Sequence, residues 1–267
     1  MEPGATPRRY WENRYGALTV QSASCLGLST GFLRGGLYRG MAAAVRRHIR
    51  SARGVDALDV GSGVGEWIAF WHALGTGSVA GVDLSDAAVD GLTRRFPGDR
   101  FVQGDISASA PYDATFGVIS CVNVLQHIAD DRLLAAACLH LRAMAEPGSR
   151  LVCIDAMTFG RAPEAGPRAV SIVRRVADVR AALLASGWRV DLVEPAIWLF
   201  NSPVEVRPRL VCGATRLLWK VISLAARSST LGRGLSIALF PLDRLLCRLS
   251  WGPSSKLILA TAVEWET

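Results

Sequence analysis

The sequence is poor in lysine, in paired cysteines and in long apolar runs. Lys220 and Lys256 are the two lysines, so arginine carries almost all of the positive charge, a composition typical of GC-rich coding. The six cysteines form no C-x-x-C pair and no zinc-type spacing with the four histidines, which favours reduced, mostly buried thiols. The first fifteen residues lack the apolar core of a secretory signal, and no charge-free run reaches the ~18 residues of a membrane span. We therefore expect a cytoplasmic protein.

The positive charge is concentrated in the later part of the chain. Residues 1–160 have 15 basic and 15 acidic side chains, whereas residues 161–256 have 15 basic and 6 acidic ones. This surplus favours an anionic partner or surface, and a solvated basic face is the alternative. With 267 residues, half of them apolar, the chain is long enough for one large α/β domain with an appended cap.

The most informative stretch lies between residues 55 and 74. An apolar run of strand type at 55–60 is followed by three glycines within 61–65 and by helical spacing from 66 onward. This order of strand, glycine turn and helix brings bare backbone close to a nucleotide-like ligand. A dinucleotide fingerprint needs glycine at its sixth position, where this sequence has Glu66, so hydride transfer is disfavoured. The alternative is a glycine turn that closes the junction without any ligand.

Strand and helix patterns alternate along the following residues. Continuous apolar runs predict buried parallel strands, and amphipathic runs predict helices between them. Further strands are expected at 78–83, 100–103, 116–121, 150–155, 188–193 and 256–263, and helices at 85–95, 130–145 and 174–185. The alternation predicts an α/β fold with a doubly wound, mostly parallel, seven-stranded sheet.

Two segments outside this pattern are predicted to be helical additions. Residues 1–54 are expected to form an N-terminal helical cap over the mouth of the domain, and 196–255 a long helical insertion, or lid, before the last strand. The core is then formed by 55–195 and 256–267. Within the insertion, basic residues recur at helical spacing over 209–227 beside apolar ones. This helix either packs on the sheet edge or makes a peripheral contact with a membrane surface.

Several marks, in order, resemble the small-molecule type of class I S-adenosylmethionine-dependent methyltransferases. They are the acidic glycine motif Asp59-x-Gly61-x-Gly63-x-Gly65, Asp83 at the end of the second strand, Gly104-Asp105 after the third, a block at 124–128 similar to L-x-H-I/V, and the turn at 146–149. The resemblance covers about residues 55–193. It implies a Rossmann-like methyltransferase fold, S-adenosylmethionine as the cofactor, and transfer of its methyl group.

The resemblance also implies where the cofactor binds. The three glycines let the main chain approach the ligand, and Asp83 accepts hydrogen bonds from both ribose hydroxyls. The complete expected set is Asp59 at the methionine end, Gly61, Gly63, Gly65, Asp83 with Leu84, Asp105 on the adenine amino group, Ile106 on the ring, and Asn123. The alternatives are a helix N-terminal acid for Asp83 and a turn aspartate for Asp105.

Two residues are candidates for the proton chemistry. Methyl transfer from a sulfonium needs alignment, and it needs a base only where an acceptor hydroxyl must lose a proton. His127, just past the fourth strand, is the first candidate, and Asp155, at the end of the fifth, is the second. For His127 the alternative is a histidine that fixes the loop. Asp130 and Asp131 are explained as helix-start acids, so no metal is expected.

The acceptor is predicted from what surrounds this core. Where methyltransferases of nucleobase amines have an N-P-P-F/Y tetrapeptide, residues 121–124 read CVNV, and no aromatic platform for RNA is present, so no nucleic acid is expected. We expect a small-molecule acceptor, a sugar or natural-product hydroxyl, in contact with Tyr10, Trp11 and Tyr15. For these rings, anchoring in the core is the alternative. A lipid-like acceptor and a nonenzymatic membrane-peripheral protein are the rival functions.

Overall fold

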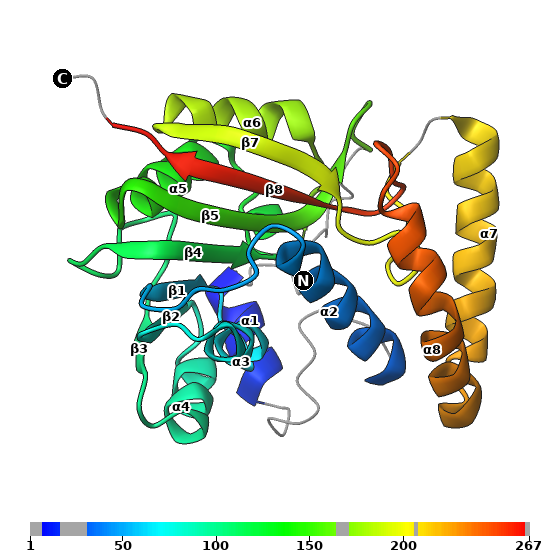
Figure 1. The fold of residues 1–267 in the computed structure, drawn as a ribbon, viewed down its shortest axis with the longest axis horizontal. Coiled ribbons are helices and arrows are strands. Elements are labelled where there is room, and N and C mark those ends of the chain that lie inside the picture. Colours follow the sequence, from blue (N-terminus) through cyan, green and yellow to red (C-terminus); the bar gives the residue numbers. More distant parts are fainter. Residues whose placement is uncertain (1–6, 17–30, 164–170, 206–207, 265–267) are drawn as a thin grey trace.

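A central sheet with helices on both faces forms the molecule (Figure 1), seen in a computed structural model that describes residues 7–16, 31–163, 171–205 and 208–264. The strands are β1 (Ala57–Val60), β2 (Val79–Asp83), β3 (Arg100–Gln103), β4 (Phe116–Val122), β5 (Ala145–Thr158), β6 (Arg174–Arg175), β7 (Trp188–Pro195) and β8 (Ser255–Ala262). The helices are α1 (Pro7–Gly16), α2 (Gly31–Arg46), α3 (Glu66–Leu74), α4 (Asp86–Arg95), the 3-10 turn η1 (Leu125–His127), α5 (Asp131–Ala143), α6 (Val176–Ala185), α7 (Arg209–Ala225) and α8 (Ser229–Leu246).

The sheet has the strand order β3-β2-β1-β4-β5-β8-β7. Its strands are parallel except β8, which runs antiparallel to both β5 and β7. The predicted doubly wound, mostly parallel sheet is therefore confirmed. The two-residue strand β6, which pairs with the end of β5, was not predicted, because two residues are too few to show a pattern. The order reverses between β1 and β4, where the carboxyl ends of neighbouring strands diverge and leave a crevice.

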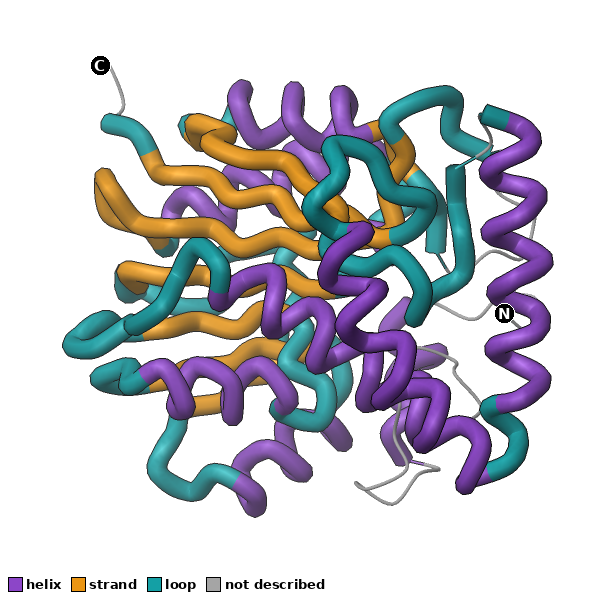
Figure 2. The backbone as a smooth tube through the Cα atoms, turned by 45° about the vertical axis from the view of Figure 1, so that its right-hand side comes forward, coloured by secondary structure: helices purple, strands orange, loops and turns teal. Residues whose placement is uncertain are grey.

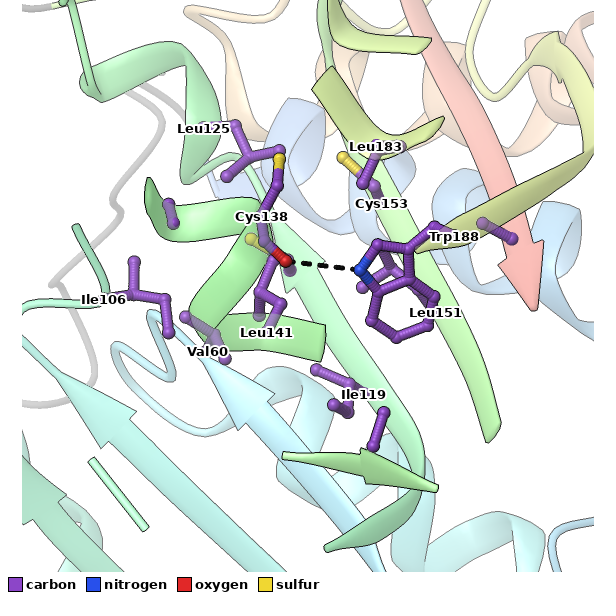
Figure 3. Close-up of a cluster of buried hydrophobic side chains, with 14 of the residues drawn as sticks. Val60, Ile106, Ile119, Leu125, Cys138, Leu141, Leu151, Cys153, Leu183 and Trp188 are labelled. Carbon is purple, nitrogen blue, oxygen red and sulfur yellow. Dashed lines mark hydrogen bonds between the residues drawn. The ribbon is translucent and has the colours of Figure 1, made fainter. Parts of the chain in front are cut away.

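Two apolar layers cover the two faces of the sheet. Successive strand residues point to opposite faces, so Ala57 packs in one layer and Leu58 in the other. Helices α2 and α3 complete the first layer, and α5 and α6 complete the second. Figure 3 shows the second layer, in which the fully buried Trp188 donates a hydrogen bond from Nε1 to the carbonyl of Cys138 at 3.3 Å. The sheet is thus held between two cores, which fixes its strand ends.

The added helices are connected to the core through α2. Leu37 and Met41 of α2 are buried in the first apolar layer, so this helix covers the sheet as well as belonging to the predicted cap. Helix α8 packs against α2, and α7 lies beyond α8 at the edge of the molecule (Figures 1 and 2). Part of the predicted cap, residues 17–30, lies outside the described residues. The boundaries at 54, 195 and 256 stay predictions.

The described cysteines are buried free thiols, namely Cys121, Cys138, Cys153, Cys212 and Cys247, while Cys25 lies outside the described residues. Burial raises the pKa of the thiols of Cys121 and Cys153 well above the ordinary value, so they are protonated. Within the described part of the chain, none of the helices combines the length and hydropathy needed to cross a bilayer.

Candidate active site at the strand ends

A cavity of about 490 Å³ lies where the sheet order reverses. The ends of β1, β2 and β4 contribute Val60, Asp83 and Val122 to its wall, and the turn after β3 contributes Asp105. Asp83 and Asp105 therefore face one hollow, as the resemblance requires. Its volume is in the range of small-molecule sites, roughly 300–1,000 Å³.

Asp83 is held by backbone amides at the floor of this cavity. Its Oδ2 accepts a hydrogen bond from the amide of Gly63 at 2.8 Å, and its Oδ1 accepts one from the amide of Ser85 at 3.0 Å. Burial raises the pKa of Asp83 to about 6, and the hydrogen bonds from the amides of Ser85 and Gly63 act in the opposite direction. The carboxylate is thus fixed in orientation while it still lines the cavity.

The three glycines of the turn have different structural roles. Gly61 has φ +72° and lines the cavity, and a Cβ there would lie 2.3 Å from Cγ2 of Val124. Gly63 uses its amide to hold Asp83. Gly65 has φ +82°, precedes α3, and leaves room for Phe96, whose Cε2 would lie 2.4 Å from a Cβ. Of the three, Gly61 lines the cavity, and the other two shape the turn around it.

The turn after β3 forms the next part of the wall. The Oδ1 of Asp105 accepts hydrogen bonds from the amide of Ser107 at 2.9 Å and from its hydroxyl at 2.7 Å. Ile106 is buried and lines the cavity beside Asp105, as does Leu84 next to Asp83. An acidic oxygen and an apolar side chain therefore adjoin each other, which suits the edge and the face of a purine ring.

The segment after β4 contributes Asn123 and His127. Asn123 has φ +57°, and it is the one residue other than glycine with positive φ in the described part of the chain. Asparagine tolerates this conformation better than most side chains, and such outliers cluster at functional sites. Both residues line the cavity, with His127 at the end of the 3-10 turn η1.

Helix α1 forms another part of the wall and is attached to α4. Glu12 accepts hydrogen bonds from the amides of Asp86 at 2.9 Å and Ala87 at 3.2 Å, so it caps the first turn of α4. The ring of Trp11 then meets that of His127 edge to face, with centroids 4.9 Å apart. Trp11 and Tyr15 line the cavity. Helix α1 thus brings aromatic rings from the start of the chain to the strand ends.

Like Gly63 and Gly65, three further predicted site residues do not line the cavity. Asp59 is buried in the sheet, where its Oδ1 accepts a hydrogen bond from the hydroxyl of Ser120 at 2.6 Å, and burial raises its pKa to about 7. Asp155 is likewise buried, and burial raises its pKa to about 7. Tyr10 packs against Trp11 instead, with ring centroids 5.1 Å apart. Their assigned roles stay predictions.

The cavity also has lining residues that sequence reasoning missed. Gln126 lines it, and its Oε1 accepts a hydrogen bond from the amide of Ala156, so this side chain adjoins the residue after Asp155. Its position beside His127 in the matched block was the available signal. Other missed residues include Ser62, Glu66, Trp67, Tyr38, Leu133, Ser171 and Ile172. Tyr38 and Ile172 come from segments without a motif.

The two acidic residues at the start of α5 have structural partners. Asp130 caps α5, with its Oδ1 accepting from the amides of Arg132 at 2.7 Å and Leu133 at 3.3 Å. Asp131 pairs with Arg174 at 3.1 Å. In the parts of the chain that the structure describes, no group of three or more His, Cys, Asp or Glu side chains is placed to hold a metal ion.

The strand order and the glycine turn define the class I methyltransferase fold, and a family comparison agrees with this assignment. Residues 57–148 match a family model described as a methyltransferase domain. The matched range runs from β1 into the start of β5 and contains Gly61, Asp83, Asp105 and His127. This stretch is therefore similar to a methyltransferase domain, and the chain shares the fold of solved S-adenosylmethionine-dependent methyltransferases. A comparison with curated proteins finds no match to the sequence.

Solved structures with this fold are distant in sequence. An S-adenosylmethionine dependent methyltransferase from Mesorhizobium loti is 19% identical, with a TM-score of 0.55 over 84% of this chain and 99% of that one. Magnesium protoporphyrin IX methyltransferase from Synechocystis, with bound SAH, is 15% identical, with a TM-score of 0.56 over 96% and 97%. The cyclase SpnF is 16% identical, with a TM-score of 0.55 over 85% and 80%. The fold is therefore shared by proteins of different activity, and the reaction must be argued from the site.

Proposed function

We propose that this protein binds S-adenosylmethionine and transfers its methyl group to an oxygen atom of a small metabolite. The observation that carries the proposal is a single cavity with two kinds of wall. Asp83 and Asp105 line it at the strand ends, and His127 and Trp11 line it from η1 and α1. The first pair suits a nucleoside, and the second pair suits an acceptor held over it.

The residues present fit the cofactor chemically. Each carboxylate oxygen has more than one lone pair. Asp83 is therefore able to accept hydrogen bonds from ribose hydroxyls while it keeps those from the amides of Gly63 and Ser85. The Oδ1 of Asp105 is occupied by Ser107, so Oδ2 is the oxygen that an adenine amino group would meet. Gly61 lines the cavity without a side chain, which leaves backbone accessible to the amino-acid end.

The chain's own residues have three tasks in the reaction. When bound, S-adenosylmethionine supplies an electrophilic methyl group on a sulfonium. Trp11 and Tyr15 shield the cavity from water and restrict the orientation of the acceptor. We assign His127 as the base that accepts the proton of an acceptor hydroxyl, and Asn123 as a polar group that orients it. Asp155 is buried outside the cavity wall, which favours His127 over it as the base.

An apolar, lipid-like acceptor is the second candidate, on the evidence of the lining. Besides the aromatic rings, the helix-side wall contains Ile128, Leu133 and Ile172. Such a surface gains binding free energy from apolar acceptor area, at about 25 cal/mol per Å². A polar sugar would use fewer of these side chains. The nature of the acceptor therefore separates the two versions of the proposal.

Calorimetry followed by an acceptor screen tests the proposal. The full chain should release or take up heat with S-adenosylmethionine and with its demethylated product, and absence of binding would support a nonenzymatic protein instead. With an acceptor in hand, His127→Ala should lower turnover by ~10²–10⁴ while cofactor affinity is kept. His72→Ala is the control, because His72 is half-exposed, pairs with Asp99 and does not line the cavity. Equal turnover of the His127 variant would return His127 to a structural role.

A further inference from the structure

Helix α7 has apolar side chains on two opposite sides. Its inner side buries Cys212 and Ile222. On its outer side Leu210 is 89% exposed and Leu217 is 65% exposed. At 3.6 residues per turn, side chains seven positions apart lie on one line, so these leucines share that line with Leu224. We call this set the outer stripe of α7, which consists of Leu210, Leu217, Val221 and Leu224, each more than half exposed.

Helix α8 carries a second stripe of the same kind. It buries Ser236, Asp243 and Cys247 on one side. On the other side its exposed apolar side chains are Leu231, Leu242, Leu245 and, just past the helix, Leu249, and Ile237 is exposed on a flank. Helices α7 and α8 lie beside each other at one end of the molecule (Figures 1 and 2). Single exposed leucines are ordinary, whereas two such rows mark an interaction surface.

The charge on these helices has one sign. Between residues 208 and 250 the sequence has seven basic side chains and one acidic one, Asp243. Asp243 is fully buried, and its Oδ1 accepts hydrogen bonds from the amides of Trp198 and Leu199. Arg209 and Lys220 of α7 are exposed, and helical geometry puts them together on one flank of the outer stripe, with the exposed Arg227 just past the end of the helix. The apolar rows are therefore bordered by cations, with no exposed acid in this described segment.

We infer that the outer face of α7 and α8 docks onto an anionic lipid bilayer. The leucines would enter the boundary between headgroups and acyl chains, and the arginines and Lys220 would remain at the level of the phosphates. The bordering cations distinguish this occupant from a second copy of the chain. Two copies joined through this face would bring their cationic flanks together, and like charges oppose such a contact. The inference goes beyond the proposed reaction and does not depend on it.

The docking face is connected to the cavity through α2. Arg39 of α2 donates a hydrogen bond to the hydroxyl of Ser236 at 2.7 Å, and Arg244 of α8 donates one to the carbonyl of Gly40 at 2.7 Å. Tyr38, on the same helix, lines the cavity. A bilayer bound by α7 and α8 would thus lie one helix away from the site, an arrangement that suits an apolar acceptor partitioned into the membrane.

Vesicle co-sedimentation of the full chain tests the inference directly. The protein should sediment with vesicles that contain phosphatidylglycerol and much less with phosphatidylcholine alone, and added salt should weaken the binding. Leu217→Glu should lower the bound-to-free ratio about tenfold or more, since it removes one inserted leucine and adds an anion. Lys220→Gln should lower it about fivefold.

A matched leucine elsewhere supplies the control. Leu184 of α6 is 50% exposed, so Leu184→Glu makes the same chemical change on a helix outside the docking face and should leave sedimentation unchanged. Thermal melting should show that the variants are folded. Equal sedimentation of the wild type and Leu217→Glu would overturn the inference, and so would equal binding to both vesicle types. A dimer by light scattering that Leu217→Glu converts to a monomer would assign the face to self-association instead.

Discussion

The two walls of the cavity are built in opposite ways. The strand-end wall consists of residues at or just past the ends of β1 to β4, with Asp83 held by two backbone amides. The helix-side wall consists of side chains on α1, α2, η1, α5 and the segment at 171–172, brought together from distant parts of the chain. One wall is therefore continuous with the core, whereas α1, with Trp11, is anchored by the cap that Glu12 makes on α4.

Because of this difference, ligand binding and fold stability are coupled in the strand-end wall and largely separate on α1. A change in the strand-end wall disturbs the turn, the sheet and the ligand contacts together, because the same backbone serves all three. A change on α1 alters a side chain on a surface helix and leaves the sheet intact. We therefore expect mutations in the first wall to affect folding or cofactor affinity strongly, and those in the second wall to affect mainly the acceptor.

The largest effect is expected for Gly61→Val. The backbone has φ +72°, and a Cβ would lie 2.3 Å from Cγ2 of Val124, so both strain and collision oppose the substitution. The free energy of unfolding should fall by ~3 kcal/mol or more, measured by urea denaturation. Gly148→Ala is the control: it has φ +89° with nothing within 4 Å of a Cβ, so it isolates the conformational cost of about 1 kcal/mol. Equal losses of unfolding free energy in the two variants would show that the side chain of Val124 moves aside.

A smaller effect is expected for Asp83→Ala. Loss of charge-assisted hydrogen bonds to the ribose should raise the Kd for S-adenosylmethionine tenfold or more, equivalent to ~1.5–3 kcal/mol. Calorimetry measures it, with Asp90→Ala as the control, since Asp90 is an exposed acid on the neighbouring helix α4. An unchanged Kd for the Asp83 variant would remove the central assignment of the strand-end wall.

The pH dependence of cofactor binding should follow the pKa of Asp83. Burial raises this pKa to about 6 from 3.8, so the free protein takes up a proton here as the pH falls below about 6. Ribose hydroxyls bind the ionised form, so the Kd should rise by up to about tenfold per pH unit below that value. In the absence of cofactor, the free energy of unfolding should change with pH in the opposite direction. Between pH 3.8 and 6 the folded carboxyl holds a proton that the unfolded carboxyl has lost, so this stabilisation is lost as the pH rises. Asp83→Asn should abolish this part of the pH dependence of binding.

The strand-end wall was predictable because its residues lie at fixed places in a repeating pattern. Asp83 ends β2, Asp105 comes just after β3 and Asn123 just after β4, and parallel strands end at one edge of a sheet, so the strand pattern brings them together. Asp59 and Asp155, by contrast, lie buried among the strands and outside the cavity wall, and their assigned roles stay predictions. Which side of a strand a residue faces depends on register, and the pattern near the strand ends did not resolve it.

The helix-side wall was less predictable because it depends on tertiary contacts between distant segments. The aromatic opening indicated Trp11 and Tyr15, but nothing in the sequence pairs Glu12 with the first turn of α4. Tyr38 and Ile172 reach the cavity through helix packing and loop position, without a motif. The two-sided apolar character of α7 was visible as a pattern, and only the fold shows which side stays exposed.

The smallest effect on cofactor binding is expected for Trp11→Ala. The ring packs on His127 with centroids 4.9 Å apart and belongs to the helix-side wall. Its loss should change the Kd for S-adenosylmethionine less than about threefold, while acceptor kcat/KM falls about tenfold because an aromatic contact worth ~0.5–1.5 kcal/mol and the orientation of His127 are lost together. Tyr10→Ala is the matched control, since Tyr10 lies on the same helix and does not line the cavity. A large loss of cofactor affinity for Trp11→Ala alone would show that α1 closes over the cofactor, and the separation of the two walls would then be wrong.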